Sequence, residues 1–577
     1  MCGVIQKYRQ HDHHLCGTRQ NTRVAWARCP SASSRDCRVT VAWRSRARPA
    51  EDCALNKVKS NYFSQIATPP VVSRLLGREL YDGKGQLTVE AHVLCIIRNE
   101  EKNVCSAVIS SHREPRDDSV GDLAINGNDR RNHSVQMALD WITEPLSMML
   151  KGFEPADQAG VDKVLSDFFM ARFLERQDRT RKEQEKEQEQ ATEPVRDPTP
   201  PPPAPANKKG GGKAGTGKKS NVAEKPLPSP EPPAIVVPGS MAIGSVSLVV
   251  AKAAALLKTV PLYEHIRSLG SHQSLKNVEM PIPMVTLLNC GKTSPGKLNL
   301  VEEVIVIPVA GQRVRQIVEM VLELQKEIAK ILNATSKTGH AFNTTSDSGG
   351  LVMGCDRPEQ VLDLITEACS NLRLELGNKI CLAINCSAHE LMDYPKGKYG
   401  IISGNPKSPD ELVDIYEDLT SKYPAITALI DPFRKEDQEQ WEKLNSVLRP
   451  TCSLYCDGTY APTDPYSLER MPSPAWARGF VLKQTNQTTV TDLIRITQQL
   501  EGIVTILGTT SGEPCCDTLS DLAVGLGVNF VKLGGLNHGE RLTKYNRLIS
   551  IEEELSQRGI LGSKEEPESS HPLAAAD

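Results

Sequence analysis

The feature that most constrains the fold is a repeated pattern in the second half of the chain, in which short apolar segments alternate with amphipathic helical ones. The apolar segments run over residues 380–384, 426–430, 453–456, 479–482, 504–507 and 529–531. Between them, apolar residues recur at helical spacing, as at Leu412, Ile415 and Leu419. Short strands that alternate with helices over residues 241–556 predict an α/β fold, either a barrel or an open parallel sheet.

Polar residues stand at the end of each of these predicted strands. They are Asn385, Asp431, Asp457, Lys483, the segment Gly508-Thr509-Thr510-Ser511, and Lys532. For any single position the simpler explanation is that strands end at the surface. In a parallel barrel, however, all of these ends converge on the rim where active sites are built. Two lysines directly after apolar runs also need a partner or a ligand if they are buried. Together these residues predict a site for an anionic substrate.

A second, smaller unit is predicted over residues 70–240. Residues 87–93 alternate between apolar and polar side chains as a half-buried strand does, and Asp82-Gly83-Lys84-Gly85 before them is a turn signal. Residues 135–149 and 161–174 have helical patterns. These elements predict a small α+β domain that precedes the barrel.

A long segment inside this smaller unit, at about residues 176–235, has no apolar pattern. It is rich first in Glu, Gln, Arg and Lys, and then in Pro, Lys and Gly. Such a composition buries too little apolar surface to offset the entropy of ordering, so an insertion that passes from helix into disorder is predicted. Within it, residues 212–218 fit a phosphate-binding loop, but Lys219 replaces the Ser or Thr that would hold Mg²⁺, and no strand precedes it.

Charge is unevenly distributed along the 577 residues. Residues 1–60 carry 12 Lys and Arg against 4 Asp and Glu, although the whole chain has a net charge of −3. They show no secondary-structure periodicity, and their His and Cys residues lack zinc-site spacing, so a basic disordered extension is predicted, together with a disordered tail at 557–577. The net charge argues against a nucleic-acid partner. We find no secretory signal or membrane-spanning run, which predicts a cytoplasmic protein.

Six segments give the chain a resemblance to the enolase family. They lie at residues 296–303, 346–350, 428–433, 481–484, 511–513 and 539–546, the last reading Gly-Glu-Arg-Leu-Thr-Lys-Tyr-Asn. The resemblance runs from about Val72 to Leu555 without the insertion, and it is closest to the divergent sperm-type enolases of vertebrates. It implies a small α+β domain followed by a TIM-type barrel, a magnesium cofactor, and the dehydration of 2-phosphoglycerate to phosphoenolpyruvate in glycolysis. It also implies a dimer, with itself or with another enolase, and a location in the sperm flagellum.

The resemblance assigns roles to individual residues. Lys483 matches the lysine that accepts the proton, Lys532 the lysine that binds the substrate carboxylate, and Glu303 a catalytic glutamate that contacts the substrate. Ser511 matches the last residue of the phosphate-binding segment, and Asp457 one of three metal-binding carboxylates. Enolases use such a base together with Mg²⁺, which stabilises the negative charge that develops on the ene-diolate.

At several other positions the chain departs from the family. Asn385 and Ile430 stand in place of the other two metal carboxylates, which weakens Mg²⁺ binding, although Asn385 retains an oxygen. Ser348 replaces the glutamate that assists departure of the hydroxyl group. Thr509-Thr510 replaces the His-Arg pair that binds phosphate, and Ser294 replaces a loop histidine. The sequence leaves open whether Asp431, Glu302 or Glu513 supplies a missing metal ligand.

Two functions remain compatible with this pattern. The first is an enolase-like lyase, weak or dependent on a partner because its metal, phosphate and acid positions are changed. Loss of the general acid alone costs about 10²–10⁴-fold in rate. The second is a non-catalytic protein of the enolase fold that assembles glycolytic or cytoskeletal partners.

Overall fold

The computed structural model describes residues 69–110, 123–191, 237–270, 276–335, 344–457, 476–510 and 512–562, with only the helical backbone at 123–128 and 183–191. The predicted disordered regions at residues 1–60, in the insertion beyond Ala191 and in the tail beyond Gly562 lie outside the described residues. Ser511 lies outside them as well.

The small domain contains a three-stranded antiparallel sheet. Its strands are β1 (Val71–Tyr81), β2 (Leu87–Ile97) and β3 (Glu100–Val108), in the order β1-β2-β3. The predicted turn joins β1 to β2, and Asp82 Oδ1 accepts hydrogen bonds there from the backbone N–H groups of Lys84 and Gln86, at 2.9 Å each. Thus the predicted strand at 87–93 is confirmed as the first part of β2.

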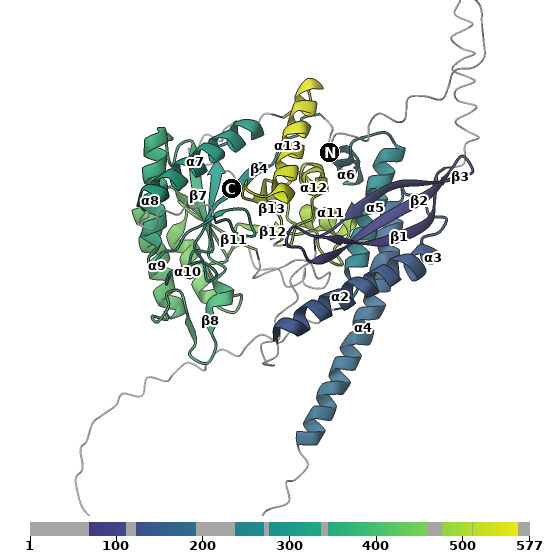
Figure 1. Cartoon of the computed structure of the whole chain (residues 1–577), viewed down its shortest axis with the longest axis horizontal. Helices are drawn as coiled ribbons and strands as arrows, with labels where there is room; N and C mark the ends of the chain where they lie inside the picture. The colour runs from purple at the N-terminus through teal and green to yellow at the C-terminus, as the bar shows by residue number, and fades with distance from the viewer. Residues whose placement is uncertain are drawn as a thin grey trace, which may run out of the picture. The chain divides into compact units, whose positions relative to one another are not determined.

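Six helical elements accompany this sheet. They are α2 (Leu123–Trp141), a π-helical turn η1 (Ile142–Leu146), α3 (Ser147–Met149), α4 (Gln158–Ala191), α5 (Met241–Leu257) and α6 (Leu262–Leu269). The helix predicted over 135–149 becomes π-helical over Ile142–Leu146, a turn that contains Pro145, which has no N–H to donate to the helix. The one predicted over 161–174 forms part of α4, the long helix of Figure 1, which continues to Ala191. Among the described helices, none is by itself long and apolar enough to cross a membrane, and the bent pair α5 and α6 meets that test only by length and composition.

The second part of the chain forms a closed barrel of eight strands (Figure 1). They are β4 (Ile282–Asn289), β5 (Glu303–Pro308), β7 (Ile380–Asn385), β10 (Ile426–Ile430), β11 (Ser453–Cys456), β12 (Gly479–Leu482), β13 (Val504–Gly508) and β14 (Phe530–Gly534). Pairing of β14 with β4 closes the barrel, and β6 (Leu351–Val352) is added beside β4. The predicted TIM-type barrel is therefore confirmed, and the open sheet is excluded.

One strand differs from the all-parallel arrangement that the strand-end argument assumed. β5 runs antiparallel to both of its neighbours, β4 and β7. Glu303, its first residue, therefore pairs with Asn289 and Asn385, which are the last residues of those strands. The reversal places the beginning of β5 on the same rim as the carboxyl ends of the parallel strands.

Helices follow the strands around the barrel. They are α7 (Val314–Thr335), α8 (Pro358–Leu372), α9 (Pro409–Lys422), α10 (Gln438–Leu448), α11 (Val490–Gln499), α12 (Thr518–Leu526) and α13 (Gly539–Gln557). A short helix η2 (Ala388–Leu391) and a hairpin of β8 (Met392–Asp393) and β9 (Lys398–Tyr399) follow β7. Beyond α13 the backbone continues in contact with Val278, whose N–H donates to Ile560 O and whose carbonyl accepts from Gly562, both at 2.8 Å.

Apolar side chains fill the barrel separately from the larger core that surrounds it. The interior cluster includes Met284, Ile305, Ile430, Tyr455 and Phe530, all almost inaccessible to solvent. The surrounding core packs the outer faces of the strands against the helices. Hence the barrel is a packed structure, and chemistry is confined to its ends.

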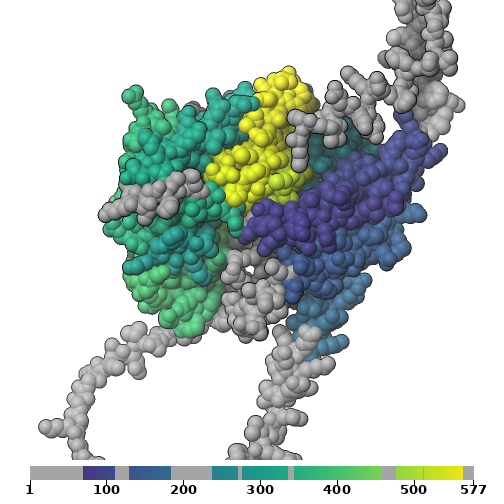
Figure 2. Space-filling view, in the orientation of Figure 1, coloured from purple at the N-terminus to yellow at the C-terminus, as the bar shows by residue number. Residues whose placement is uncertain are grey.

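The small domain and the barrel meet on the side where β1 and β2 are joined. Gly83 N donates to Glu513 O at 2.8 Å, and Gly83 lies against the side chain of Glu540 in α13. Figure 2 shows the purple β1–β3 segment beside the yellow C-terminal segment on this face. This contact brings the end of β1 next to the loop that follows β13.

Candidate active site

Two lysines and two carboxylates meet at the rim of the barrel. Lys532, in β14, has its Nζ 2.8 Å from Glu303 Oε2 and 3.4 Å from Asp457 Oδ2. Lys483, which follows β12, forms an ion pair with the other oxygen of Asp457. The four side chains come from β5, β11, β12 and β14 or the residue directly after them. The structure thus brings together the residues that the sequence analysis identified as base, substrate ligands and metal ligand.

These groups are buried, and their charges determine their protonation. Burial raises the pKa of Asp457, but the positive charges of Lys483 and Lys532 outweigh it and hold that pKa well below its usual range. Burial also raises the pKa of Glu303, and Lys532 again lowers it below the usual value. Burial lowers the pKa of Lys532, whereas Glu303 and Asp457 raise it to a net value well above normal. Both carboxylates are therefore ionised at neutral pH, and Lys532 is protonated.

Asn385 at the end of β7 takes part in this array as a hydrogen-bond donor. Its Nδ2 donates to Glu303 Oε2 at 2.9 Å, and its Oδ1 accepts from Ser387 N at 3.3 Å and Ser387 Oγ at 3.2 Å. Thr286 Oγ1 donates to the other oxygen of Glu303 at 3.1 Å. An ionised aspartate at position 385 has no proton to donate and would repel Glu303. The Asn385 amide, together with Lys532, therefore stabilises the ionised Glu303 carboxylate.

Ile430 and Asp431, at the end of β10, do not provide a second metal ligand beside Asp457. Ile430 is fully buried in the apolar interior of the barrel. Asp431 has a backbone φ of +48°, and its Oδ1 accepts a hydrogen bond of 2.9 Å from the backbone N–H of Asp457. Its Oδ2 lies 3.7 Å from His389 Nδ1. Asp431 therefore positions the backbone of Asp457.

Ser348, at the position of the family's glutamate, lies in a cluster of neutral groups. Its Oγ donates to Asn289 Oδ1 at 3.1 Å and lies 2.9 Å from Ser346 Oγ, which also donates to Asn289 at 2.6 Å. A serine hydroxyl does not ionise at working pH and is a weak proton donor. This part of the rim can bind a hydroxyl group through hydrogen bonds, but Ser348 is poorly suited to protonate it.

Arg541, Lys544 and Glu513 support the loop after β13. From the sequence, Glu513 was considered only as a possible metal ligand, and Arg541 and Lys544 had no role in the site. Arg541, which is 1% exposed, donates to the carbonyl oxygens of Thr510 and Asp347 at 2.9 and 3.2 Å. Glu513 accepts from Thr510 N at 2.7 Å and pairs with Lys544 at 3.1 Å. Arg541 and Lys544 lie within the Gly539–Asn546 segment that carried the resemblance. That segment is the sequence signal that points to these two side chains.

The oxygen donors at this rim differ from those that bind a magnesium ion. Mg²⁺ requires near-octahedral oxygen coordination, usually with one or two carboxylates that are free to bind it. Both oxygens of Asp457 are bound to lysines, and Asn385 is engaged at both ends of its amide. Within the described ranges no group of three or more His, Cys, Asp or Glu side chains could hold a metal. The residues present therefore do not fit the family's metal.

Two more acidic residues were left open as replacement ligands. Burial, together with the charges of Glu303 and Glu390, raises the pKa of Glu302 to about 7, and the Glu302 carboxyl lies against Gly291 in the loop after β4. Glu513 is paired with Lys544. Neither residue belongs to a metal-binding group in the part of the chain that the structure describes.

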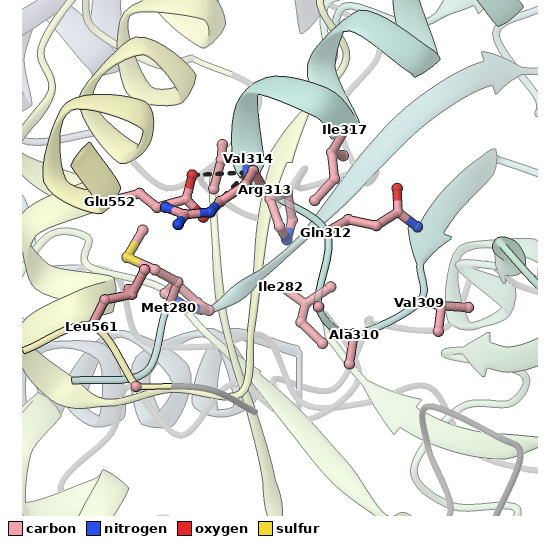
Figure 3. Close-up of a pocket in the computed structure, with 14 residues that line it drawn as sticks. Met280, Ile282, Val309, Ala310, Gln312, Arg313, Val314, Ile317, Glu552 and Leu561 are labelled. Atoms are coloured by element: carbon pink, nitrogen blue, oxygen red, sulfur yellow. Dashed lines mark hydrogen bonds between the residues drawn. The ribbon is translucent and has the colours of Figure 1, made fainter. Parts of the chain in front are cut away.

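A cavity of about 320 Å³ lies at the other end of the barrel (Figure 3). It is lined mainly by residues at the start of β4 and between β5 and α7, such as Met280, Ile282 and Val309. The Glu552 carboxylate at its edge accepts hydrogen bonds from Val314 N at 3.1 and 3.4 Å and so caps α7. None of the rim residues described above lines this cavity, which is therefore separate from the candidate active site.

The chain has a small α+β domain followed by a closed barrel, and paired lysines and carboxylates lie at one rim. These features define an α/β protein with a TIM-type barrel. Residues 277–569 match the family described as "Enolase, C-terminal TIM barrel domain". Proteins named "Enolase 4" are similar over most of the chain. The one from Danio rerio is 49% identical over 511 residues, covering 88% of this chain and 86% of its own length. The one from Homo sapiens is 46% identical over 526 residues, covering 88% and 84%. The chain belongs to the enolase family.

Proposed function

We propose that this chain is an enolase-like lyase, a phosphopyruvate hydratase that dehydrates 2-phosphoglycerate to phosphoenolpyruvate in glycolysis, and that its turnover is slow or depends on a partner subunit. The observation that carries this proposal is the chain of contacts Lys483–Asp457–Lys532–Glu303 at the rim. It keeps a candidate base beside a candidate carboxylate ligand on rigid strands, where such groups are held most precisely.

The roles follow from the chemistry of the reaction. The carbon next to the substrate carboxylate loses a proton to Lys483 Nζ, and the negative charge that develops on the carboxylate is stabilised by Lys532. The electron pair left on that carbon forms the new double bond as the C–O bond on the neighbouring carbon breaks. The departing hydroxide takes a proton from solvent and leaves as water, because Ser348 is a weak acid. Glu303 contacts the substrate, and the hydroxyl of Ser348 occupies the position beside the leaving group.

Three features of the site support a slow reaction. Lys483 is engaged with Asp457, so this contact has to be exchanged before its Nζ can reach the substrate carbon. Ser348 replaces a carboxylic acid at the leaving-group position. Thr509 and Thr510 lack the charged, bidentate contact that an arginine makes with phosphate. Enolases as a family use Mg²⁺, whereas the donor set at this rim does not fit the ion, and no step here is assigned to it.

The same features favour a second candidate, a non-catalytic enolase-fold subunit that assembles glycolytic or cytoskeletal partners. The specific observation is that Asp457, a metal ligand in the family, is saturated by two lysines. Under either function, membership of the family supports a homodimer or a heterodimer with another enolase, in the cytoplasm and, by resemblance, in the sperm flagellum.

The deciding experiment measures phosphoenolpyruvate formation by the purified chain, free of other enolases. The wild type is compared with Lys483→Ala and with the control Lys443→Ala, which removes an exposed lysine of α10. Turnover in the wild type and the control that is lost in Lys483→Ala supports the lyase. Equal rates in all three proteins would support the non-catalytic subunit.

A further inference from the structure

We propose that the ion-pair chain of Lys483, Asp457, Lys532 and Glu303 takes over the charge-neutralising role of the divalent cation, so that the site binds a small phosphorylated carboxylate without one. This inference rests on the proposed function, because it concerns the substrate anion of the same site. It predicts a cation requirement different from that of the enolase family as a whole.

The charges at the rim balance without a metal ion. The rim holds two ammonium groups and two carboxylates, each in contact with a group of opposite sign, and the distances at Lys532 are 2.8 and 3.4 Å. A divalent cation is attracted to a site that has excess negative charge. Here Asp457 is shared between two lysines, so a cation would have to displace an ammonium group that is already paired in a buried environment.

Positions 430 and 385 do not offer a free oxygen to a cation. Ile430 contributes its side chain to the packed interior of the barrel, together with Met284, Ile305 and Tyr455. Asn385 directs its N–H toward Glu303 and its oxygen toward Ser387. Position 430 therefore offers no oxygen. The amide oxygen at position 385 already accepts hydrogen bonds from Ser387 in the same loop.

An anion can enter the site by exchanging with one of the rim carboxylates. The carboxylate of a ligand can replace Asp457 or Glu303 as the partner of an ammonium group without changing the number of ion contacts. Lys483 is 19% exposed and Lys532 is 11% exposed, so Lys483 is the more accessible of the two. We expect the ligand to approach past the more exposed Lys483, and its carboxylate to exchange with Asp457 at Lys532, which keeps its contact with Glu303.

Calorimetry of phosphoenolpyruvate binding tests this inference without requiring turnover. The titration is performed on the full chain in EDTA and again in excess Mg²⁺, and the expected result is the same Kd in both. Lys483→Met is expected to weaken binding equally in the two conditions, and the exposed control Lys443→Met is expected to leave it unchanged.

A second arm restores the family's carboxylates. In Asn385→Asp, and in the double variant with Ile430→Glu, the added charge is expected to weaken binding in EDTA by about tenfold or more, and Mg²⁺ is expected to restore it. The single variant changes only the rim, so it remains informative if the double variant does not fold, as judged by its thermal transition.

The outcomes separate the inference from the proposed function. Binding by the wild type only in Mg²⁺ would overturn the inference and leave the proposed function intact. No binding in either condition would overturn both. Asn385→Asp with unchanged affinity in EDTA would also overturn the inference, because charge balance would then not control binding.

Discussion

The buried ion pair between Glu513 and Lys544 offers a quantitative test of how the barrel holds the loop after β13. Both side chains are almost inaccessible, 4% and 0% exposed, and their charged atoms are 3.1 Å apart. Glu513 also accepts hydrogen bonds from Ser110 Oγ at 2.5 Å and Thr510 N at 2.7 Å. Burial raises the pKa of Glu513, but Lys544 and Arg541 lower it below the usual value, so Glu513 is ionised at neutral pH.

Replacing Lys544 by Met keeps the apolar stem and removes the charge. A buried carboxylate that loses its partner typically costs about 3–5 kcal/mol. The amine also donates to the carbonyls of Pro514 and Glu540 at 3.1 and 3.0 Å, and these acceptors lose a donor. Because Arg541 remains nearby and lowers the charge penalty, we expect a loss of about 4 kcal/mol in the free energy of unfolding.

A double-mutant cycle identifies the cause of that loss. Glu513→Gln retains an oxygen for Ser110 and Thr510 and removes the charge, so in the Lys544→Met background it should recover about 2 kcal/mol. The assay is urea unfolding followed by tryptophan fluorescence, with the exposed Lys443→Met as the matched control. A cost below about 1 kcal/mol for Lys544→Met, or no recovery in the double variant, would refute the electrostatic reasoning.

Three other outcomes are expected. His265 is buried, its ring nitrogens have no hydrogen-bond partner among the described residues, and burial, with the charge of Lys258, lowers its pKa to about 4 from 6.5. The unfolded chain therefore binds the proton more tightly, and stability should fall by about 2–3 kcal/mol as pH decreases from 6.5 to 4, a loss that His265→Gln should reduce in pH-dependent unfolding. Ser348→Glu should raise the rate of phosphoenolpyruvate formation by about 10²-fold if an acid is missing, and an unchanged rate would count against that explanation. Gly535→Ala would place a Cβ 2.1 Å from Gly349 O, which is backbone and cannot move aside easily, so calorimetry should show a loss of about 2–3 kcal/mol.

The sequence predicted those parts of the site that depend on strand ends. Lys483, Asp457 and Asn385 each follow an apolar run, and parallel strands bring such positions to one rim. Glu303 could be assigned only from the resemblance, because it begins a strand, and the antiparallel direction of β5 does not follow from its apolar composition. The fold class followed from the alternation of strands and helices, which is a strong and local signal.

Other parts of the site depend on contacts between segments that are distant in the sequence. Lys544 and Glu513 are paired although 31 positions separate them, and no periodicity connects a loop residue to a helix residue. Asp431 lies one residue beyond the strand, and the sequence does not indicate that a φ of +48° directs its carboxylate to the backbone of Asp457. Such features follow from tertiary packing, so they were identified only once the structure was known.

The substitutions at the rim are best understood as a coupled set. If an aspartate replaced Asn385 alone, the Glu303 carboxylate would lose the N–H that now stabilises it at 2.9 Å and would gain a negative neighbour, with only Lys532 to balance both. If a glutamate replaced Ile430 alone, it would place a charge at the end of an apolar cluster. Each reversal is therefore unfavourable unless a cation is bound. The loss of two metal ligands and the pairing of Asp457 with two lysines thus favour one another. The neutral residues at positions 385 and 430 therefore fit a site whose charge is balanced internally.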